Sequence, residues 1–275
     1  MGRAMADFAP VITFLSDYGL DDDFVGICHG VIARFCPEAR VIDLTHGIAR
    51  QDVRGGALVL QGALPYLPDG VNLAVVDPDV GAERRAVALR LADDQMMVGP
   101  DNGLLSLAAE HAGGVIEAVD IAHSKFRLEP VSATFHGRDI FAPVAAALAR
   151  GVPLAETGDP CDPDLLVRIT LPQPRVEDGV LRASAIHVDR YGNVGLNVEH
   201  ELLTELGLRL GQPVALRVGA GRFEANYVRT FADVSPGELL AYEDAYQRLS
   251  LAVSRGSAAE LLGVGVDDEL AIRFG

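Results

Sequence analysis

Apolar runs and helix-like segments alternate along the first 150 residues of the chain. Short apolar runs that end in polar loops are typical of buried strands, and several stretches between them place apolar residues at helical spacing. The strand candidates are APVITFLSDYG, RVIDLTHGI, VNLAVVDPD and the pair AVALRLA and QMMVGPDNG; the helix candidates are FVGICHGVIARF, VRGGALVLQGALPYL, LLSLAAEHAGG and GRDIFAPVAAALARG. Strands that alternate with helices predict an α/β fold with a mostly parallel sheet.

The pattern changes near residue 170. TLPQPRVEDG contains two prolines and no helical period, which is typical of a linker. Short strand-like runs follow, such as VLRASAIHVD and RFEANYVRTF, with one helix candidate in YEDAYQRLSLAVSRGSAAELLG. We therefore expect an N-terminal α/β domain over residues 1–170, a linker over 171–180, and a smaller, mostly β and barrel-like C-terminal domain over 181–275.

The charge and composition narrow the classes of partner. The net charge of −16 argues against binding to nucleic acid or to an anionic membrane, since both require a basic surface. No run of about 18 apolar residues is present, and MGRAMADFAP lacks the apolar core of a signal peptide. The three cysteines form no CxxC pair, so neither a disulfide framework nor a cysteine zinc site is expected. These features predict a soluble, cytoplasmic protein.

Polar residues gather where the predicted strands of the α/β domain end. Each one alone is explained by a helix cap or a turn. Ligands of open α/β sheets, however, bind beyond the carboxyl ends of the strands, where such residues converge. A binding site is therefore the better explanation of the whole set, which comprises Asp17, His46, Asp77, Arg84, Asp101, Asn102 and His136.

Three of these residues suggest a chemistry. Asp77, Arg84 and His136 could together position and deprotonate a water molecule. The alternative is that Asp77 and Arg84 form a structural ion pair and that His136 caps the helix that begins near Gly137. No GxSxG, HExxH or phosphate-binding glycine motif is present, so covalent acyl chemistry is disfavoured, no motif requires a metal, and nucleotide phosphates have no obvious cradle.

The polar loops together resemble a known family. TFLSDYGLDDDFVG, VIDLTHGI, VVDPDVGAERR, VGPDNGLL, FHGRDIFAPVAA and HVDRYGNVGLN are similar, in order and spacing, to the S-adenosyl-L-methionine (SAM) hydroxide adenosyltransferases, which are relatives of fluorinase and chlorinase. The resemblance implies an α/β domain followed by a β domain, and trimers with each active site between neighbouring subunits. It also implies attack of hydroxide on C5′ of SAM, with adenosine and methionine as products, SAM as the substrate and no cofactor.

The family's functional positions can be located in this chain. Its catalytic Asp, Arg and His fall on Asp77, Arg84 and His136. The substrate-binding positions that the resemblance implies are Asp17 for the ribose hydroxyls, Asp189 for the methionine ammonium, Asn193 for the adenine edge, and Arg255 for the base or the carboxylate.

Two departures from the family pattern leave alternatives open. Asp79 stands where the family commonly has Gly, and DAYQRLS stands where an NSFGYLE-like segment is common. A SAM-dependent halogenase is one alternative, although such relatives place Tyr at the position of His136 and lack the Asp and Arg. A non-catalytic SAM or adenosine binder is the other, and the substitution His136→Ala would leave its function intact.

Overall fold

The computed structural model describes residues 9–275, which form two compact units divided between Ile169 and Thr170. The expectation about a signal peptide rests largely on residues 1–8 and lies outside the described residues. Within the described part of the chain, no helix is both long and apolar enough to cross a membrane. The three cysteines are free thiols.

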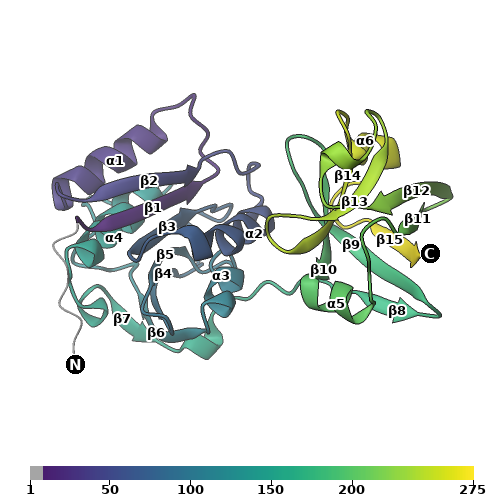
Figure 1. Cartoon of the computed structure of the whole chain (residues 1–275). Helices are drawn as coiled ribbons and strands as arrows, with labels where there is room; N and C mark the ends of the chain where they lie inside the picture. The colour runs from purple at the N-terminus through teal and green to yellow at the C-terminus, as the bar shows by residue number, and fades with distance from the viewer. Residues whose placement is uncertain (1–8) are drawn as a thin grey trace. The chain divides into compact units, whose positions relative to one another are not determined.

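The first unit is built on a seven-stranded sheet in the order β2-β1-β3-β5-β4-β6-β7 (Figure 1). β2, β1, β3 and β5 pair in parallel, β4 is antiparallel to both β5 and β6, and β7 is antiparallel to β6. Five of the seven strands therefore run in one direction, which confirms the predicted α/β fold with a mostly parallel sheet. The strands are β1 (Val11–Ser16), β2 (Arg40–Thr45), β3 (Val71–Val75), β4 (Ala86–Leu91), β5 (Met96–Pro100), β6 (Val115–Asp120) and β7 (Asp159–Cys161).

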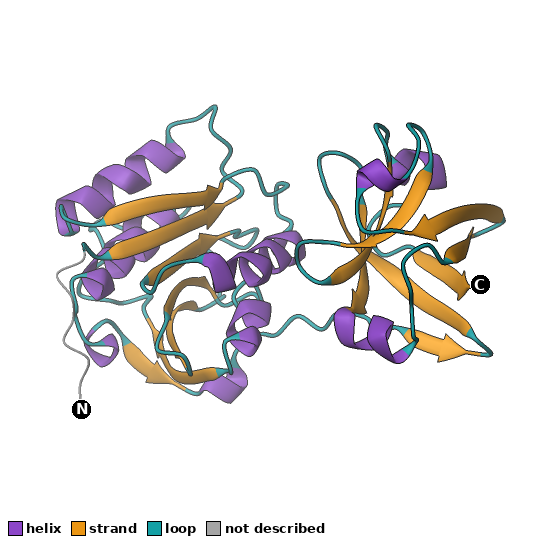
Figure 2. Ribbon diagram, viewed as in Figure 1, coloured by secondary structure: helices purple, strands orange, loops and turns teal. Residues whose placement is uncertain are grey.

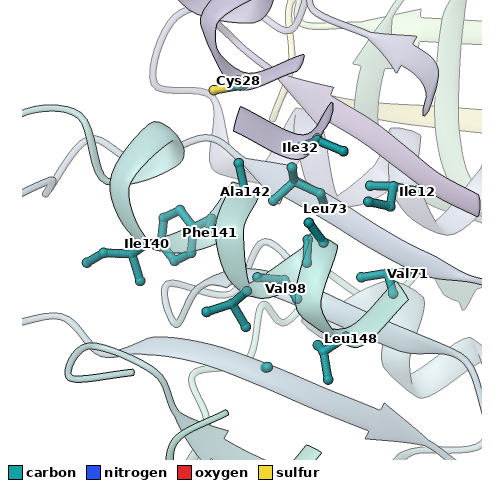
Figure 3. Close-up of a cluster of buried hydrophobic side chains, with 14 of the residues drawn as sticks. Ile12, Cys28, Ile32, Val71, Leu73, Val98, Ile140, Phe141, Ala142 and Leu148 are labelled. Atoms are coloured by element: carbon teal, nitrogen blue, oxygen red, sulfur yellow. The ribbon is translucent and has the colours of Figure 1, made fainter. Parts of the chain in front are cut away.

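Helices cover both faces of this sheet. Because side chains alternate between the two faces along each strand, neighbouring residues of one strand belong to different hydrophobic cores. Phe14 of β1 belongs to the core under α1 and α4, whereas the next residue, Leu15, belongs to the core under α2. Figure 3 shows the first core, in which Phe141 packs among aliphatic side chains. The helices are α1 (Phe24–Phe35), α2 (Val53–Ala63), α3 (Ser106–His111) and α4 (Ala142–Ala149), which continues the π-helical turn η2 (Gly137–Phe141); the short 3-10 turns are η1 (Leu64–Tyr66), η3 (Leu154–Glu156) and η4 (Pro163–Leu165).

The strand directions bring the polar loops to one edge of the sheet. The five strands of common direction all end there, and β4, which runs the other way, begins there. The loops that follow β1, β3 and β6 lead to Asp17, Asp77 and His136 respectively. The topology thus brings residues that are far apart in the chain to one shared edge of the sheet, as the sequence predicts.

The second unit is a closed barrel of seven strands, shown in orange in Figure 2. The order β10-β14-β13-β12-β11-β15-β9 closes through the pairing of β9 with β10, and β8 extends the sheet beyond β9. This confirms the predicted β-rich, barrel-like C-terminal region. Its elements are β8 (Arg175–Glu177), β9 (Val180–Val188), β10 (Val194–Glu199), α5 (His200–Glu205), β11 (Pro213–Val218), β12 (Gly221–Tyr227), η5 (Phe231–Asp233), β13 (Leu239–Glu243), β14 (Arg248–Val253), α6 (Ala258–Leu262) and β15 (Glu269–Phe274).

Two local expectations differ from the structure. The helix predicted over residues 242–263 is wrong for most of its length, because β13 and β14 form an antiparallel pair there and only α6 is helical. A tight turn at Asp244, with Gln247 at a positive φ of 61°, reverses the chain where a helix would have continued. The segment expected as a linker, residues 171–180, contains β8.

Candidate active site

The charged turn between β3 and β4 contains a buried ion pair. Nε of Arg84 donates to both carboxylate oxygens of Asp77, at 2.9 and 3.1 Å, and Nη2 donates to Oδ2 as well. The Arg84 side chain is 8% exposed and that of Asp77 is 6% exposed. A forked pair of this kind holds the guanidinium in a single orientation.

His136 joins this pair from a distant part of the chain. Nη2 of Arg84 lies 2.9 Å from Nδ1 of His136. Because a guanidinium can only donate, Nδ1 must accept, and the imidazole is then neutral with its proton on Nε2. Burial, and then the nearby Arg84 charge, lower the pKa of His136 below its ordinary value, which favours the same neutral form. The structure therefore brings together the three residues that the sequence singled out.

The remaining surroundings of Arg84 leave part of its guanidinium available. The aromatic ring of Phe141 lies below it, with the guanidinium carbon 5.3 Å from the ring centroid. Nη1 makes one long contact of 3.4 Å, to the carbonyl oxygen of Arg85. A second N–H of Nη1 can thus donate to a water molecule or an anion beside the pair.

The loop that carries His136 is fixed to the charged turn by backbone contacts. Gly81 has a φ of 82°, and a Cβ there would lie 2.3 Å from the carbonyl oxygen of Ala133, so only glycine allows the two loops to approach so closely. Behind His136, the buried carboxylate of Asp139 accepts from the Ser132 amide at 2.8 Å and from Arg138 at 2.6 and 2.9 Å.

These contacts also decide between the two interpretations of His136. His136 precedes η2, but its side chain makes no capping hydrogen bond to that turn. Its ring is turned to Arg84 instead, so a helix-capping role does not account for the residue.

Tyr18 is a residue of this site that the sequence analysis missed. Its hydroxyl lies against Gly137, where a Cβ would come within 2.1 Å of the phenol oxygen. Burial raises the pKa of Tyr18 well above its ordinary value, and the charges of Asp17 and Asp77 add to this effect. The hydroxyl therefore keeps its proton at neutral pH and can donate a hydrogen bond, within electrostatic range of both carboxylates and of Arg84. Its position next to Asp17 in the SDYG loop was the available signal.

The other polar residues of this edge have local roles. Asp17 accepts from the Gln51 amide at 2.9 Å through one carboxylate oxygen, Oδ2. Arg85 pairs with the buried Asp101 at 2.6 Å, and Asp101 also accepts from the Val167 amide at 2.8 Å. Asn102 donates to the Val76 carbonyl at 2.8 Å and thereby joins β5 to β3. Arg85, Asp101 and Asn102 thus hold the edge together rather than extend the triad.

Asp189 and Asn193 of the barrel unit lie together in one turn between β9 and β10. Oδ1 of Asp189 accepts from the amides of Tyr191 and Asn193 at 2.8 and 2.9 Å, and Oδ2 accepts from Nδ2 of Asn193 at 2.7 Å. Gly192, at a φ of 78°, is pressed against Ser257. The Asp189 carboxylate and Nδ2 of Asn193 are therefore bonded within the turn itself.

Arg255 lies on the loop that approaches this turn. It is exposed and has a positive φ of 59°, and its loop runs on to Ser257, which contacts Gly192. Burial, together with the charges of Asp244 and Asp189, raises the pKa of Tyr242 to about 12, so a protonated phenol lies near the same turn.

The two departures from the family pattern also have defined places. Asp79 is exposed, and its carbonyl oxygen accepts from the Ala82 amide at 2.9 Å, which makes it a turn residue. Asp244 accepts from the Ser250 hydroxyl at 2.8 Å and closes the hairpin of β13 and β14.

Comparison with known sequences identifies the family. The sequence profile of the SAM hydroxide adenosyltransferase N-terminal domain matches residues 12–158, and that of the C-terminal domain matches residues 183–271. The chain belongs to this family.

Individual relatives and a solved structure agree with this assignment. An (R)-S-adenosyl-L-methionine hydrolase of Salinispora tropica is 51% identical over 266 residues, which cover 97% of this chain and 98% of the relative. A fluorinase of Actinoplanes sp. is 30% identical and covers 88% of this chain and 90% of its own length. The crystal structure of an uncharacterized conserved protein from Thermotoga maritima superposes with a TM-score of 0.90 at 38% identity, covering 95% of this chain and 99% of that one.

Proposed function

We propose that this protein is an enzyme that hydrolyses (R)-S-adenosyl-L-methionine to adenosine and L-methionine. The observation that carries the proposal is the buried ion pair of Asp77 and Arg84 with His136 bonded to it, found in a chain 51% identical to a hydrolase of that name. A fluorinase is a more distant relative, at 30% identity.

The reaction balances without any further reactant. The oxygen of water forms a bond to C5′ of SAM, the bond from C5′ to the sulfonium sulfur breaks, and its electron pair stays on the sulfur of methionine. The water loses one proton to the solvent. The leaving group is a neutral thioether, which needs no general acid, and SAM is consumed as substrate rather than used as a cofactor.

Activation of the water is the difficult step, because the pKa of free water is about 15.7. In the proposed mechanism, the available N–H of Arg84 binds the water and stabilises its hydroxide form. Asp77 holds the guanidinium in place, and neutral His136 fixes the other side of it without adding a positive charge that would compete for the hydroxide. Placement in line with the C5′–S bond supplies proximity.

Binding of SAM is assigned to the remaining predicted residues. Asp17 uses its free carboxylate oxygen, together with Oδ2, to accept the vicinal ribose hydroxyls. Asp189 binds the methionine ammonium, Asn193 contacts the adenine edge, and Arg255 binds near the base or the carboxylate. We further propose that the protein is a homotrimer in which a neighbouring subunit's barrel completes each site. Sedimentation at assay concentration tests the trimer separately.

Product analysis tests the activity directly. The purified protein is incubated with each sulfonium epimer of SAM in a chloride-containing buffer, and the products are separated by liquid chromatography. We expect equal amounts of adenosine and methionine from the R epimer, and neither product from the His136→Ala variant. A 5′-chloro product would instead indicate a halogenase, and unreacted SAM that stays bound would indicate a binding protein.

A further inference from the structure

A cluster of two histidines and one aspartate lies at the start of the α/β unit, apart from the triad. Nε2 of His29, on α1, is 2.8 Å from Oδ1 of Asp43, on β2. Nε2 of His46, just after β2, is 3.0 Å from the same oxygen. All three ligand atoms lie within 4.8 Å of one another.

His46 provides the independent sign that this cluster is incomplete. Its side chain is 2% exposed, and its buried Nε2 makes no hydrogen bond of acceptable geometry within the described structure, despite its distance to Asp43. Buried polar atoms are rarely left in this state, and an ion is one of the groups that resolves it. Nε2 lies within 4.8 Å of the other two ligand atoms, and an ion bound among the three would give it a partner.

The surroundings of His46 leave its Nε2, rather than its Nδ1, available to bind an ion. Nδ1 of His46 lies 2.8 Å from the hydroxyl oxygen of Ser16. If Nδ1–H donates to this oxygen, the lone pair of Nε2 faces Asp43 and His29. An outer hydrogen bond of this kind is the usual means by which proteins fix the tautomer of a metal-binding histidine.

We propose that His29, Asp43 and His46 form a binding site for a divalent transition-metal ion, with Zn²⁺ as the best-matched ion. Two imidazoles and one carboxylate are preferred zinc ligands, and three protein ligands leave a fourth position open to water. Tetrahedral coordination at about 2.1 Å places ligand atoms about 3.4 Å apart, so the two histidine nitrogens need to move away from Oδ1 of Asp43 by only about half an ångström.

The exposure of the cluster makes that adjustment and the entry of the ion feasible. The side chains of His29 and Asp43 are 36% and 41% exposed, so they can move, whereas His46 is fixed from behind. Phe14 forms an apolar wall, since its ring packs edge-on against His46 at 4.7 Å between centroids.

Binding of the ion would join three elements at the edge that carries Asp17. His46 touches Ser16 at the end of β1, and its carbonyl oxygen accepts from the Gly19 amide at 2.8 Å. The ion would therefore fasten α1 and the end of β2 to the loop of residues 16–19. This site does not depend on the proposed hydrolase activity, and its test uses no substrate.

Metal titration of the complete protein tests the site. Tag-free protein is stripped with a chelator, dialysed, and titrated with ZnCl₂ by calorimetry, and separately with CoCl₂ while the visible absorption is recorded. We expect one equivalent of Zn²⁺ to bind, and Co²⁺ to give the strong visible bands of a four-coordinate nitrogen and oxygen site.

Substitutions of the exposed ligands locate the bound ion. Loss of an outer-shell partner alone weakens metal binding by about 10–100-fold, so His29→Ala or Asp43→Asn should weaken it by more than about 100-fold. The matched control is His200→Ala, because His200 also contacts a carboxylate, Glu243, at 2.8 Å but has no second histidine in that pair.

The titrations give different results if the metal site exists and if it does not. Unchanged binding by the His200→Ala variant, with loss in both cluster variants, supports the site. No binding by the wild-type protein overturns the proposal, and so does equal binding by the wild-type protein and the His29→Ala variant. Circular dichroism of each variant confirms that it is folded before titration.

Discussion

The Asp77 cluster and the Asp189 turn satisfy their polar groups in opposite ways. Asp77, Arg84 and His136 depend on partners 7 and 52 residues away. The side chains of Asp77 and Arg84 are nearly buried, and His136 is half-buried. Asp189 and Asn193 are bonded to each other within one turn. The turn explains its own residue types, whereas the Asp77 cluster joins a buried ion pair to a histidine from a distant loop.

The difference shows when hydrogen bonds within a turn are enough to explain why a polar residue is present. A polar residue whose bonds are all made nearby is explained by the backbone it shapes. A buried charge that reaches across the fold costs free energy and needs a reason, which is structural for Asp101 and Arg85 and which we propose is chemical for Asp77 and Arg84. Local bonding accounts for Asp189 and Asn193 but not for the contact between Arg84 and His136, and experiments on the two regions test this contrast.

The largest expected effect is from Arg84→Lys. The substitution keeps the charge but removes the fork that binds Asp77 and contacts His136, so kcat should fall by about 10²–10³-fold, as for loss of one electrostatic donor. Arg85→Lys is the matched control, because Arg85 pairs with Asp101 outside the triad. Steady-state kinetics with SAM would measure both, and similar losses in the two variants would contradict the distinction between them.

Asp189→Asn tests whether the turn has a role beyond its own structure. Removal of one charged hydrogen bond to the methionine ammonium should raise KM by about 10- to 150-fold, with little change in kcat. Asp93→Asn is the control, because Asp93, like Asp189, accepts from backbone and side-chain amides close by in sequence, in its case one of each from Gln95. If the two variants differed only in thermal stability and neither changed KM, Asp189 would be a turn residue alone.

Gly137→Ala should destabilise the protein by about 1–3 kcal/mol, since the new methyl group would overpack against Tyr18. Tyr18→Phe removes the closest atom, so the double variant should recover part of the loss. Gly26→Ala, in α1 with open space around it, should be neutral or slightly stabilising. Chemical denaturation measures the free energy of unfolding of the wild-type protein and of the four variants. Additive effects of the two substitutions at Tyr18 and Gly137 would contradict the contact.

The smallest expected effect is on the pH profile. The pKa of His136 lies below its ordinary 6.5, so the neutral form is retained as the pH falls through that value. Below the lowered pKa, kcat/KM should decrease about tenfold per pH unit, because the protonated ring can no longer accept from Arg84. Asp77 raises this pKa, so Asp77→Asn should move the acid limb to still lower pH. An acid limb at or above 6.5 would contradict the assignment.

The lowered pKa of His136 also predicts the direction in which the stability of the protein changes with pH. A depressed pKa in the folded state means that the unfolded chain binds the proton more readily. Its contribution therefore lowers the free energy of unfolding as the pH falls below 6.5. Thermal melts of the wild-type protein and the His136→Ala variant across that range separate this contribution from the other titrating groups.

Much of the fold followed from the sequence because its signals are local. Apolar runs and helical spacing gave the elements of the α/β unit, and the prolines near residue 170 marked the change to β structure. The predicted helix over residues 242–263 failed because β13 and β14 are apolar and joined by a turn without glycine or proline, in which Gln247 takes the positive φ. Single-sequence periodicity cannot distinguish such a hairpin from a buried helix.

The site was predictable only where position along the strands implied proximity. Asp77, Arg84 and His136 follow or precede strands that meet at one edge, and the structure places them in contact. Tyr18 was missed because aromatic residues beside a strand end are also common in cores. The grouping of His29, Asp43 and His46 was missed because separations of 14 and 3 residues match no familiar motif, and only the packing of α1 against β2 brings them together.

The convergence of strand ends on one edge has a consequence for redesign. The loops after β1, β3 and β6 carry Asp17, the charged turn and His136, while both hydrophobic cores lie behind the strands. Exchange of these loops with those of a fluorinase relative would leave most of both cores in place but must preserve the contacts that Tyr18 and Phe135 make with the first core. Two close approaches tie the loops to one another, Gly81 with Ala133 and Tyr18 with Gly137, so all three loops must be transplanted together. These loops, rather than the whole protein, would then determine which nucleophile reacts.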